Sequence, residues 1–243
     1  MGTPMDARDR LAVALDTPSL PAAEALAARL AGAVRWFKIG PPLFTAQGPA
    51  AVTALRAYGR VFLDLKFHDI PSTVAAGCAA AARLGASLCT VHALGGLAMM
   101  AAARQAAGTL EPRMRVVAVT LLTSGDAVTL DEIGIGGSPI DEVHRLARLA
   151  QRGGLDGVVA SALDAAAIRE ACGEAFLIVC PGIRPRGTAA ADQRRVVTPR
   201  EAAAAGADLL VVGRPITEAP DPRAAAEAIV DEIASGEAAA PAR

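Results

Sequence analysis

Two carboxylates and one lysine lie two and three residues apart in the stretch 61–71, as Asp64, Lys66 and Asp69. The apolar residues around the first two predict a buried strand, in which residues i and i+2 point to the same face with Cα atoms roughly 6–7 Å apart. Pro71 then suits the first turn of a following helix. The pattern predicts acid–base chemistry where a strand ends and a helix begins. The alternative is a structural ion pair at the same place.

Lysine is rare in this chain, which gives Lys66 more weight than the motif alone would. Only two of the 24 basic residues are lysines, Lys38 and Lys66, and all the others are arginines. A surface cation can usually be of either type, but a lysine ammonium can give up its proton and an arginine guanidinium effectively cannot. Both lysines lie near the ends of predicted strands. We infer that the two lysines take part in chemistry that arginine could not perform.

Polar side chains recur at the ends of other predicted strands. Asp16 ends the first, Lys38 lies near the end of the second, His92 ends the fourth, and Thr123 lies just past the fifth. Because the carboxyl ends of the strands of a barrel meet at one rim, we expect these side chains to share a site with the motif above. For each residue alone a structural role remains the alternative, above all for His92, since a lone histidine is often a packing group.

Glycines and arginines gather after the last two predicted strands, in the stretches 180–187, 192–195 and 212–215. Glycine lets backbone N–H groups approach a ligand, and the arginine fork matches phosphate oxygens. Barrel enzymes often bind phosphate with the loops after strands seven and eight. A phosphorylated small molecule is therefore the favoured ligand, with ordinary loop arginines as the alternative.

Eight apolar runs alternate with helix-like stretches along the chain. The runs are continuous, as expected of parallel strands covered on both faces. They predict the α/β class and a single (β/α)8 TIM barrel over residues 1–243, with 1–10 and 236–243 as flexible ends. A doubly wound open sheet is the alternative, although no G-x-G-x-x-G motif follows the first run. The runs are 11–16, 36–40, 61–66, 87–92, 115–121, 157–161, 176–180 and 208–213.

Local signals mark where several helices begin. Ser19, Ser138 and Asp221 stand close before prolines and are expected to cap helices. Thr198 and Glu201 match a T-x-x-E capping box. Two long loops are expected at 123–137 and 181–197, each after a strand end and so on the active face of a barrel.

The composition argues against several classes of protein. A net charge of −1 and an aromatic content of 3% provide neither the basic surface nor the stacking platforms of a nucleic-acid binder, and give no attraction to an anionic membrane. The uncharged stretch 84–103 is interrupted by polar residues and glycines, so we interpret it as a strand and a helix and not as a membrane span. Four widely spaced cysteines predict buried free thiols, and no secretory signal is evident. We therefore expect a cytoplasmic protein.

Several motifs together resemble the orotidine 5′-phosphate decarboxylase family, and the resemblance runs from the first predicted strand to the last. The D-x-K-x-x-D pattern alone is shared with a wider group of sugar-phosphate decarboxylases and synthases, whereas the full set is specific. The motifs are Asp64-x-Lys66-x-x-Asp69-Ile70-Pro71, Leu122-Thr123-Ser124, Pro181-Gly182-Ile183-Arg184-Pro185, Asp192-Gln193-Arg194 and Gly213-Arg214-Pro215-Ile216-Thr217.

The resemblance implies conversion of orotidine 5′-monophosphate to uridine 5′-monophosphate and carbon dioxide, the last step of UMP biosynthesis, with no cofactor and no metal. It implies that Lys66 protonates C6 of the pyrimidine, with Asp64 and Asp69 flanking it, and that Asp69 reaches the site of a neighbouring subunit in a homodimer. Flanking carboxylates favour a charged lysine, which suits an acid and does not suit a Schiff-base nucleophile. The implied substrate-binding residues are Asp16, Lys38, Thr73, Thr123, Ser124, Arg184, Gln193, Gly213 and Arg214.

Two other functions remain open at this point. One is a related phosphosugar decarboxylase or synthase on the same barrel, and such enzymes can use a magnesium ion. The other is a non-catalytic barrel that binds a phosphorylated metabolite. The intact Asp64, Lys66 and Asp69 argue against the second, because a protein that only binds its ligand does not need a proton donor.

Overall fold

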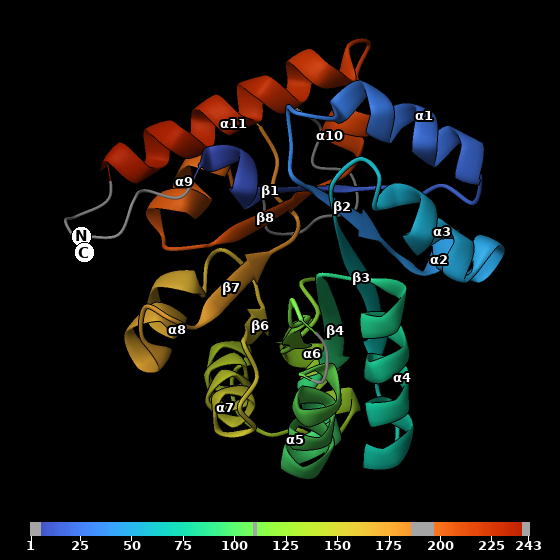
Figure 1. The fold of residues 1–243 in the computed structure, drawn as a ribbon. Helices are drawn as coiled ribbons and strands as arrows, with labels where there is room; N and C mark the ends of the chain where they lie inside the picture. The colour runs from blue at the N-terminus through green and yellow to red at the C-terminus, as the bar shows by residue number, and fades with distance from the viewer. Residues whose placement is uncertain (1–5, 109–110, 186–196, 240–243) are drawn as a thin grey trace.

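Eight parallel strands close into a barrel in chain order, each hydrogen-bonded to the next and the last to the first (Figure 1). The computed structural model describes residues 6–108, 111–185 and 197–239. The predicted (β/α)8 barrel is confirmed, and each strand begins within one residue of its predicted run. The strands are β1 (Leu11–Ala14), β2 (Trp36–Ile39), β3 (Arg60–Phe67), β4 (Leu88–His92), β5 (Arg115–Val119), β6 (Gly157–Val159), β7 (Leu177–Cys180) and β8 (Leu209–Val212).

Helices surround the barrel and cover its outer face (Figure 1). In the described part of the chain they are α1 (Leu20–Leu30), α2 (Pro41–Gln47), α3 (Pro49–Leu55), α4 (Pro71–Leu84), α5 (Gly96–Ala107), α6 (Ala127–Glu132), α7 (Pro139–Arg152), α8 (Ala165–Cys172), α9 (Pro199–Ala204), α10 (Arg214–Thr217) and α11 (Pro222–Ala239), with the 3-10 turns η1 (Ala7–Arg10) and η2 (Ala93–Gly95).

The predicted helix starts are confirmed by their hydrogen bonds. The side chains of Ser19 and Ser138 accept from backbone N–H groups in the first turns of α1 and α7. Thr198 and Glu201 form both halves of the capping box of α9. The Asp221 side chain accepts from two backbone N–H groups at the start of α11. These short polar side chains satisfy N–H groups that have no partner within a helix.

Apolar side chains from alternate strand positions form two separate cores. One core lies between the barrel and the helices, and the other fills the barrel itself. Period-two alternation along each strand separates them, since successive side chains point to opposite faces. The inner core consists of Ala12, Ala14, Trp36, Phe62, Leu88, Val117, Val179, Leu209 and Val211. A packed interior leaves room for a ligand only near the ends of the strands.

Three segments are more regular than the sequence predicted. The loop expected over 123–137 contains α6, in which Asp126 caps the helix by accepting from the Thr129 N–H at 3.0 Å. A helix of six residues is too short to show periodicity in the sequence. Residues 7–10 form η1, with Arg10 buried, and α11 continues to Ala239. Both elements extend into the ends 1–10 and 236–243, whose flexibility stays a prediction.

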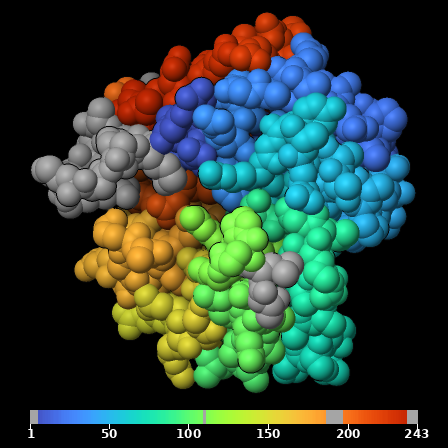
Figure 2. All heavy atoms as spheres, viewed as in Figure 1, coloured from blue at the N-terminus to red at the C-terminus, as the bar shows by residue number. Residues whose placement is uncertain are grey.

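Elements from the two ends of the sequence pack against each other and complete the ring of helices. Helix α11 contacts η1, α1, α9 and α10, and in both overall views it runs beside the N-terminal elements (Figures 1 and 2). No helix of the described residues is both long and apolar enough to cross a membrane. The cysteines Cys78, Cys89, Cys172 and Cys180 are buried free thiols, as predicted.

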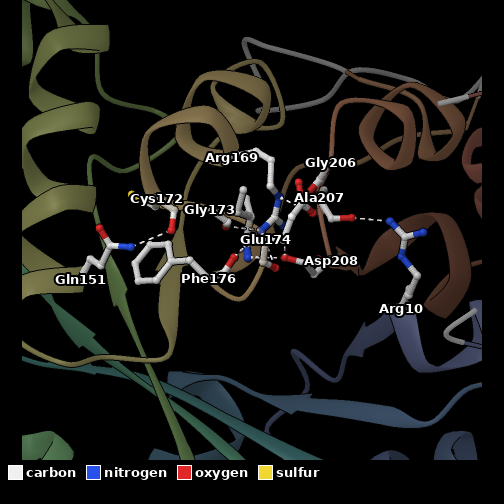
Figure 3. Close-up of polar contacts among 11 residues, drawn as sticks. Arg10, Gln151, Arg169, Cys172, Gly173, Glu174, Phe176, Gly206, Ala207 and Asp208 are labelled. Atoms are coloured by element: carbon white, nitrogen blue, oxygen red, sulfur yellow. Dashed lines mark hydrogen bonds and ion pairs between the residues drawn. The ribbon is translucent and has the colours of Figure 1, made fainter. Parts of the chain in front are cut away.

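One largely buried arginine connects the segments that precede β7 and β8 (Figure 3). Arg169, on α8, donates to the backbone carbonyls of Gly173, Glu174 and Phe176 and to that of Gly206. It also forms an ion pair of 2.6 Å with Asp208, and only 10% of its side chain is exposed. Asp208 in turn accepts from the backbone N–H of Ile178 at 2.7 Å.

We predict that Arg169→Ala lowers the free energy of unfolding by about 3–5 kcal/mol, because it leaves the Asp208 carboxylate and several carbonyls buried without their cation. Urea denaturation measures the change. Glu227→Ala is the control, since it removes an exposed pair with Arg223 within α11 and should change stability by no more than about 0.5 kcal/mol. Equal losses in the two variants would contradict the role of Arg169.

Candidate active site

Three polar side chains form the inward-facing layer nearest the carboxyl ends of β2, β3 and β4. Lys38, Asp64 and Thr90 each lie two residues beyond an apolar residue of the inner core on the same strand, and therefore point into the barrel. Thr90 and Lys38 are buried. The polar layer therefore lies directly on the apolar one, at the end of the barrel where active sites form.

Charges of alternating sign run across this layer. Lys38 Nζ lies 3.2 Å from Asp16 Oδ1 and 3.6 Å from Asp64 Oδ2. Asp64 Oδ1 lies 2.9 Å from Lys66 Nζ. The Asp64 side chain is 14% exposed, Lys38 10% and Lys66 35%. Asp64 is thus a largely buried carboxylate between two ammonium groups, and Lys66 is the more accessible of the two lysines.

The backbone at Lys66 is not that of a regular strand. The register between β3 and β4 shifts between Leu63 and Phe67, and Lys66 has a φ of +52°, the only positive value among non-glycine residues of the described chain. Left-handed backbone is unfavourable for a side chain with a Cβ and persists where its surroundings hold it. The sequence predicts that Asp64 and Lys66 point to the same face of a regular strand, whereas in the structure they meet across a bulge.

Thr90 holds this bulge in place. Its hydroxyl accepts from the Lys66 backbone N–H at 2.8 Å and donates to Asp64 Oδ1 at 3.0 Å. One buried hydroxyl therefore fixes both the lysine backbone and the carboxylate that the lysine contacts. Our sequence analysis did not identify Thr90. The available signal was a polar residue in the middle of an apolar strand.

Gly40 is a second residue that the sequence analysis did not identify. A Cβ atom at this position would lie 2.9 Å from Asp16 Oδ1 and 3.1 Å from Lys38 Nζ. Contacts at such distances would displace one side chain of this ion pair. Glycine directly after β2 therefore allows Asp16 and Lys38 to meet.

Two histidines stack beside Lys66. The rings of His68 and His92 lie 5.4 Å apart between centroids, and His92 Nδ1 accepts from the Leu94 N–H at 3.3 Å. Burial, with smaller contributions from the nearby His68 and Lys66, lowers the pKa of His92. His92 is therefore neutral at neutral pH and adds no second cation beside Lys66.

A cavity of about 200 Å³ opens at the polar layer. Lys38, Asp64, Lys66 and Thr123 contribute its polar lining. Its apolar lining is Phe62, Val119, Leu121, Leu122, Val159, Val179, Pro181 and Val211. A few convergent polar groups in a mostly apolar pocket are typical of a small-molecule site.

A larger hollow of about 780 Å³ lies between the end of β1, α1 and α10. Asp16, Gly213 and Arg214 line it together. Asp16 also contacts Lys38, which lines the smaller cavity. The ion pair between Asp16 and Lys38 therefore connects the two hollows. This arrangement suits one elongated ligand that is recognised at both of its ends.

Other predicted site residues lie apart from this network in the described part of one chain. Asp69 is exposed and, among the described residues, forms no ion pair with Lys66; its Oδ1 accepts from the Ile70 N–H at 2.6 Å. Thr73 and Ser124 are exposed on the same face. Arg184 is buried after β7, and its backbone N–H donates to the Val197 carbonyl at 3.1 Å. Gln193 lies outside the described residues.

Comparisons with known proteins agree on one family. The family model described as Orotidine 5'-phosphate decarboxylase / HUMPS family matches residues 9–229. A relative named orotidine 5'-phosphate decarboxylase from Halorhodospira halophila is 56% identical over 227 residues, which are 93% of this chain and 96% of the relative. The relative of that name from Nitrosococcus oceani is 51% identical, over 94% of this chain and 99% of its own length.

Solved structures lead to the same family. The crystal structure of orotidine 5'-phosphate decarboxylase from Lactobacillus acidophilus superposes with a TM-score of 0.82 at 37% identity, covering 93% of this chain and 99% of that one. An uncharacterized conserved protein from Geobacillus kaustophilus superposes with a TM-score of 0.81 at 41% identity, over 92% of this chain and 99% of its own. The matches cover nearly the whole barrel, and the chain belongs to the orotidine 5'-phosphate decarboxylase / HUMPS family of enzymes.

Proposed function

We propose that this protein converts orotidine 5′-monophosphate to uridine 5′-monophosphate and carbon dioxide without a cofactor, in the last step of UMP biosynthesis. The observation that carries the proposal is the accessible ammonium of Lys66, 2.9 Å from the buried Asp64 carboxylate at an apolar cavity. Relatives that are more than half identical over nearly the whole chain and bear the name of this activity support it.

The reaction needs a cation at one ring carbon. Breaking the bond between C6 and the carboxylate carbon releases carbon dioxide and leaves the electron pair on C6. This pair lies in the ring plane, where no carbonyl delocalises it, so a preorganised positive charge must stabilise it. The Lys66 ammonium supplies that charge and then transfers a proton to C6, which completes the new C–H bond. The amine regains a proton from water.

Asp64 has two roles in this proposal. It orients the Lys66 ammonium, because the two groups are within hydrogen-bond reach at 2.9 Å. It also lies near where the substrate carboxylate must enter, so the two negative charges repel each other until carbon dioxide leaves. Lys38, 3.6 Å from Asp64 on its other side, offsets part of this charge.

The linked hollows suit the two ends of a nucleotide. We propose that the pyrimidine occupies the small cavity beside Thr123 and Ser124, and that Asp16 and Lys38 bind ribose hydroxyls between the hollows. Gly213 and Arg214, with Gln193, bind the phosphate, and Arg184 supports the loop after β7. The phosphate contacts lie away from the reacting carbon, so their binding energy can be expressed in the transition state.

We propose that the protein is a homodimer that pairs through the face carrying the site. Asp69 and Thr73 are exposed there, so a second subunit has access to both. Large apolar side chains are exposed on the segments that follow β3 to β6, where a monomer would leave them in water. These side chains are Ile70, Leu94, Leu97, Leu122, Val128, Ile133, Ile140 and Leu163. A partner covering them would bring its Asp69 to the first subunit's Lys66.

Four buried free thiols among the described residues support a location in a reducing compartment, and we propose the cytoplasm. Cys78 and Cys89 lie with their sulfur atoms 4.0 Å apart and are not bonded. Disulfides form and persist in oxidising compartments.

We predict that Lys66→Ala abolishes turnover while uridine 5′-monophosphate still binds, and that Lys66→Arg, which keeps the charge, also fails because arginine does not release its proton. The change in absorbance of orotidine 5′-monophosphate measures turnover, and calorimetry measures binding. Wild-type activity should survive exhaustive chelation, unlike that of a magnesium-dependent phosphosugar enzyme. Near-normal decarboxylation by either variant would overturn the proposal.

For Thr90→Val we expect kcat to fall by about 10–100-fold with a smaller change in KM, because the bulge at Lys66 and the Asp64 carboxylate each lose one hydrogen bond. Thr90→Ser keeps the hydroxyl and should retain most of the activity. Steady-state kinetics separates the two contributions, because Thr90→Val keeps the shape and removes the hydroxyl, whereas Thr90→Ser keeps the hydroxyl and removes a methyl group. Near-normal activity of Thr90→Val together with a larger loss in Thr90→Ser would assign Thr90 a packing role only.

The shared site predicts complementation between two inactive variants. Lys66→Ala and Asp69→Ala homodimers should each be inactive, whereas mixing and reassociating them forms heterodimers with one intact site. Random pairing in a twofold dimer restores about a quarter of wild-type activity. Mixed-chain activity after dilution and reassociation is the measurement, and no recovery despite verified heterodimers would place Asp69 within its own subunit's site.

A further inference from the structure

A hollow of about 1080 Å³ lies at the end of the barrel opposite the candidate active site. It is lined by the segments that lead into β2, β3, β4 and β5. Arg60, at the start of β3, is six residues from Lys66, or about 20 Å along the strand. We call this hollow the arginine groove, after its lining residues Arg35, Arg56, Arg60, Arg83, Arg113 and Arg115.

Positive charge in the groove exceeds what its carboxylates neutralise. Among the described residues of the lining, Asp9 and Glu111 are the acids. Arg60 pairs with Asp9 at 3.1 Å, and Arg113 pairs with Asp156 at 2.6 Å. In the described chain, Arg56, Arg83 and Arg115 make no ion pair with any carboxylate. A chain with a net charge of −1 therefore concentrates unneutralised cations in one concave place.

Arg56 is held in position and is not a freely moving surface side chain. Its Nη1 donates to the Leu84 carbonyl at 3.2 Å. Gly85 has a φ of +86°, and a Cβ atom there would lie 2.5 Å from Arg56 Cζ. The guanidinium therefore lies close against a backbone position that glycine favours, and Arg56 lines the groove while it is held there. A preorganised fork loses little freedom when it binds an anion.

Aromatic rings complete the lining. Trp36 forms the buried floor, with Nε1 donating to the Asp9 carbonyl at 3.0 Å, and Arg60 Cζ lies 5.5 Å from its ring centroid. Tyr58, half-buried, is part of the wall. Arginine forks beside an aromatic wall can bind a phosphate chain and the ring that follows it.

We propose that the arginine groove is a second ligand site, which binds the di- or triphosphate group of a nucleotide or of inorganic polyphosphate. Three arginines without carboxylate partners match the charge of such a group, and the volume accommodates a whole nucleotide. A bound polyphosphate would bridge the segments before β2 to β5, the four strands that lead to Lys38, the Asp64–Lys66 bulge, Thr90 and Thr123. Binding should therefore stabilise the barrel independently of turnover.

The chain contains a direct reporter for this site, because Trp36 is its only tryptophan. Tripolyphosphate and ATP, titrated separately at low salt, should each change tryptophan emission saturably and raise the melting temperature, whereas inorganic phosphate should bind more weakly. Tighter binding of ATP would assign a nucleotide as the ligand, and equal affinities would assign the phosphate chain. Either result supports the site, and no saturable change with either compound would overturn it.

Matched double variants locate the binding. Arg83→Ala/Arg115→Ala removes two exposed side chains that form no hydrogen bonds within the described chain, and should weaken both ligands by at least about tenfold. Arg148→Ala/Arg152→Ala removes the same charge from exposed positions on α7 and should leave the affinities unchanged, as should Arg214→Ala. Arg115→Glu is a second test of the groove, and we expect it to lower the affinity for both ligands as the double alanine variant does.

Two outcomes would contradict the assignment. Equal weakening in the α7 control would show general attraction to a basic surface and no defined site. Loss of binding in Arg214→Ala, with binding kept in Arg83→Ala/Arg115→Ala, would place the ligand in the candidate active site. Circular dichroism and turnover without added polyphosphate should be unchanged in the groove variants, which separates this proposal from the proposed decarboxylase activity.

Discussion

The structure depends on one carboxylate that is held in the barrel by three different groups. Asp64 is contacted by the ammonium of Lys38, the ammonium of Lys66 and the hydroxyl of Thr90. Burying a carboxylate to this extent costs free energy unless each of its oxygens has a hydrogen-bond or ion-pair partner. Removing one partner leaves that cost incompletely offset. Lys66 depends on the arrangement in turn, because its unfavourable backbone conformation is held by the same threonine. The position of the proposed proton donor is therefore a property of β2, β3 and β4 together.

The barrel explains why chemistry occurs at its ends. Side chains alternate between the inner and outer cores, so each strand places only a few residues in the interior, and most of those places are filled by apolar groups. On β2 one inward position holds Trp36 and the next holds Lys38. Two successive inward-facing positions of this strand therefore place an aromatic residue, Trp36, at the arginine groove and a cation, Lys38, at the candidate active site. The middle of the barrel is filled with packed apolar side chains, which separate the two ends.

Much of the fold could be predicted from the sequence, because continuous apolar runs and proline-marked caps act locally. Asp64 and Lys66 were identifiable since charges are rare in a buried strand, and the scarcity of lysine singled out Lys38. Thr90 and Gly40 could not be assigned in this way, because their importance lies in what they meet across strands. The bulge at Lys66 was not foreseeable either, since period-two reasoning assumes a regular strand. Asp69 shows a further limit: within one described chain it lies exposed, and the role that the family resemblance implies for it belongs to a second subunit.

The central claim is that the Lys66 ammonium is directed at the reacting carbon while Asp64 holds it there. A crystal structure with uridine 5′-monophosphate bound tests this most directly, through the distance from Lys66 Nζ to C6 of the base. The account predicts a separation of about 3–3.5 Å, with the Asp64 carboxylate still in contact with the same nitrogen. A base bound elsewhere, or a Lys66 side chain directed into solvent with the nucleotide in place, would contradict it.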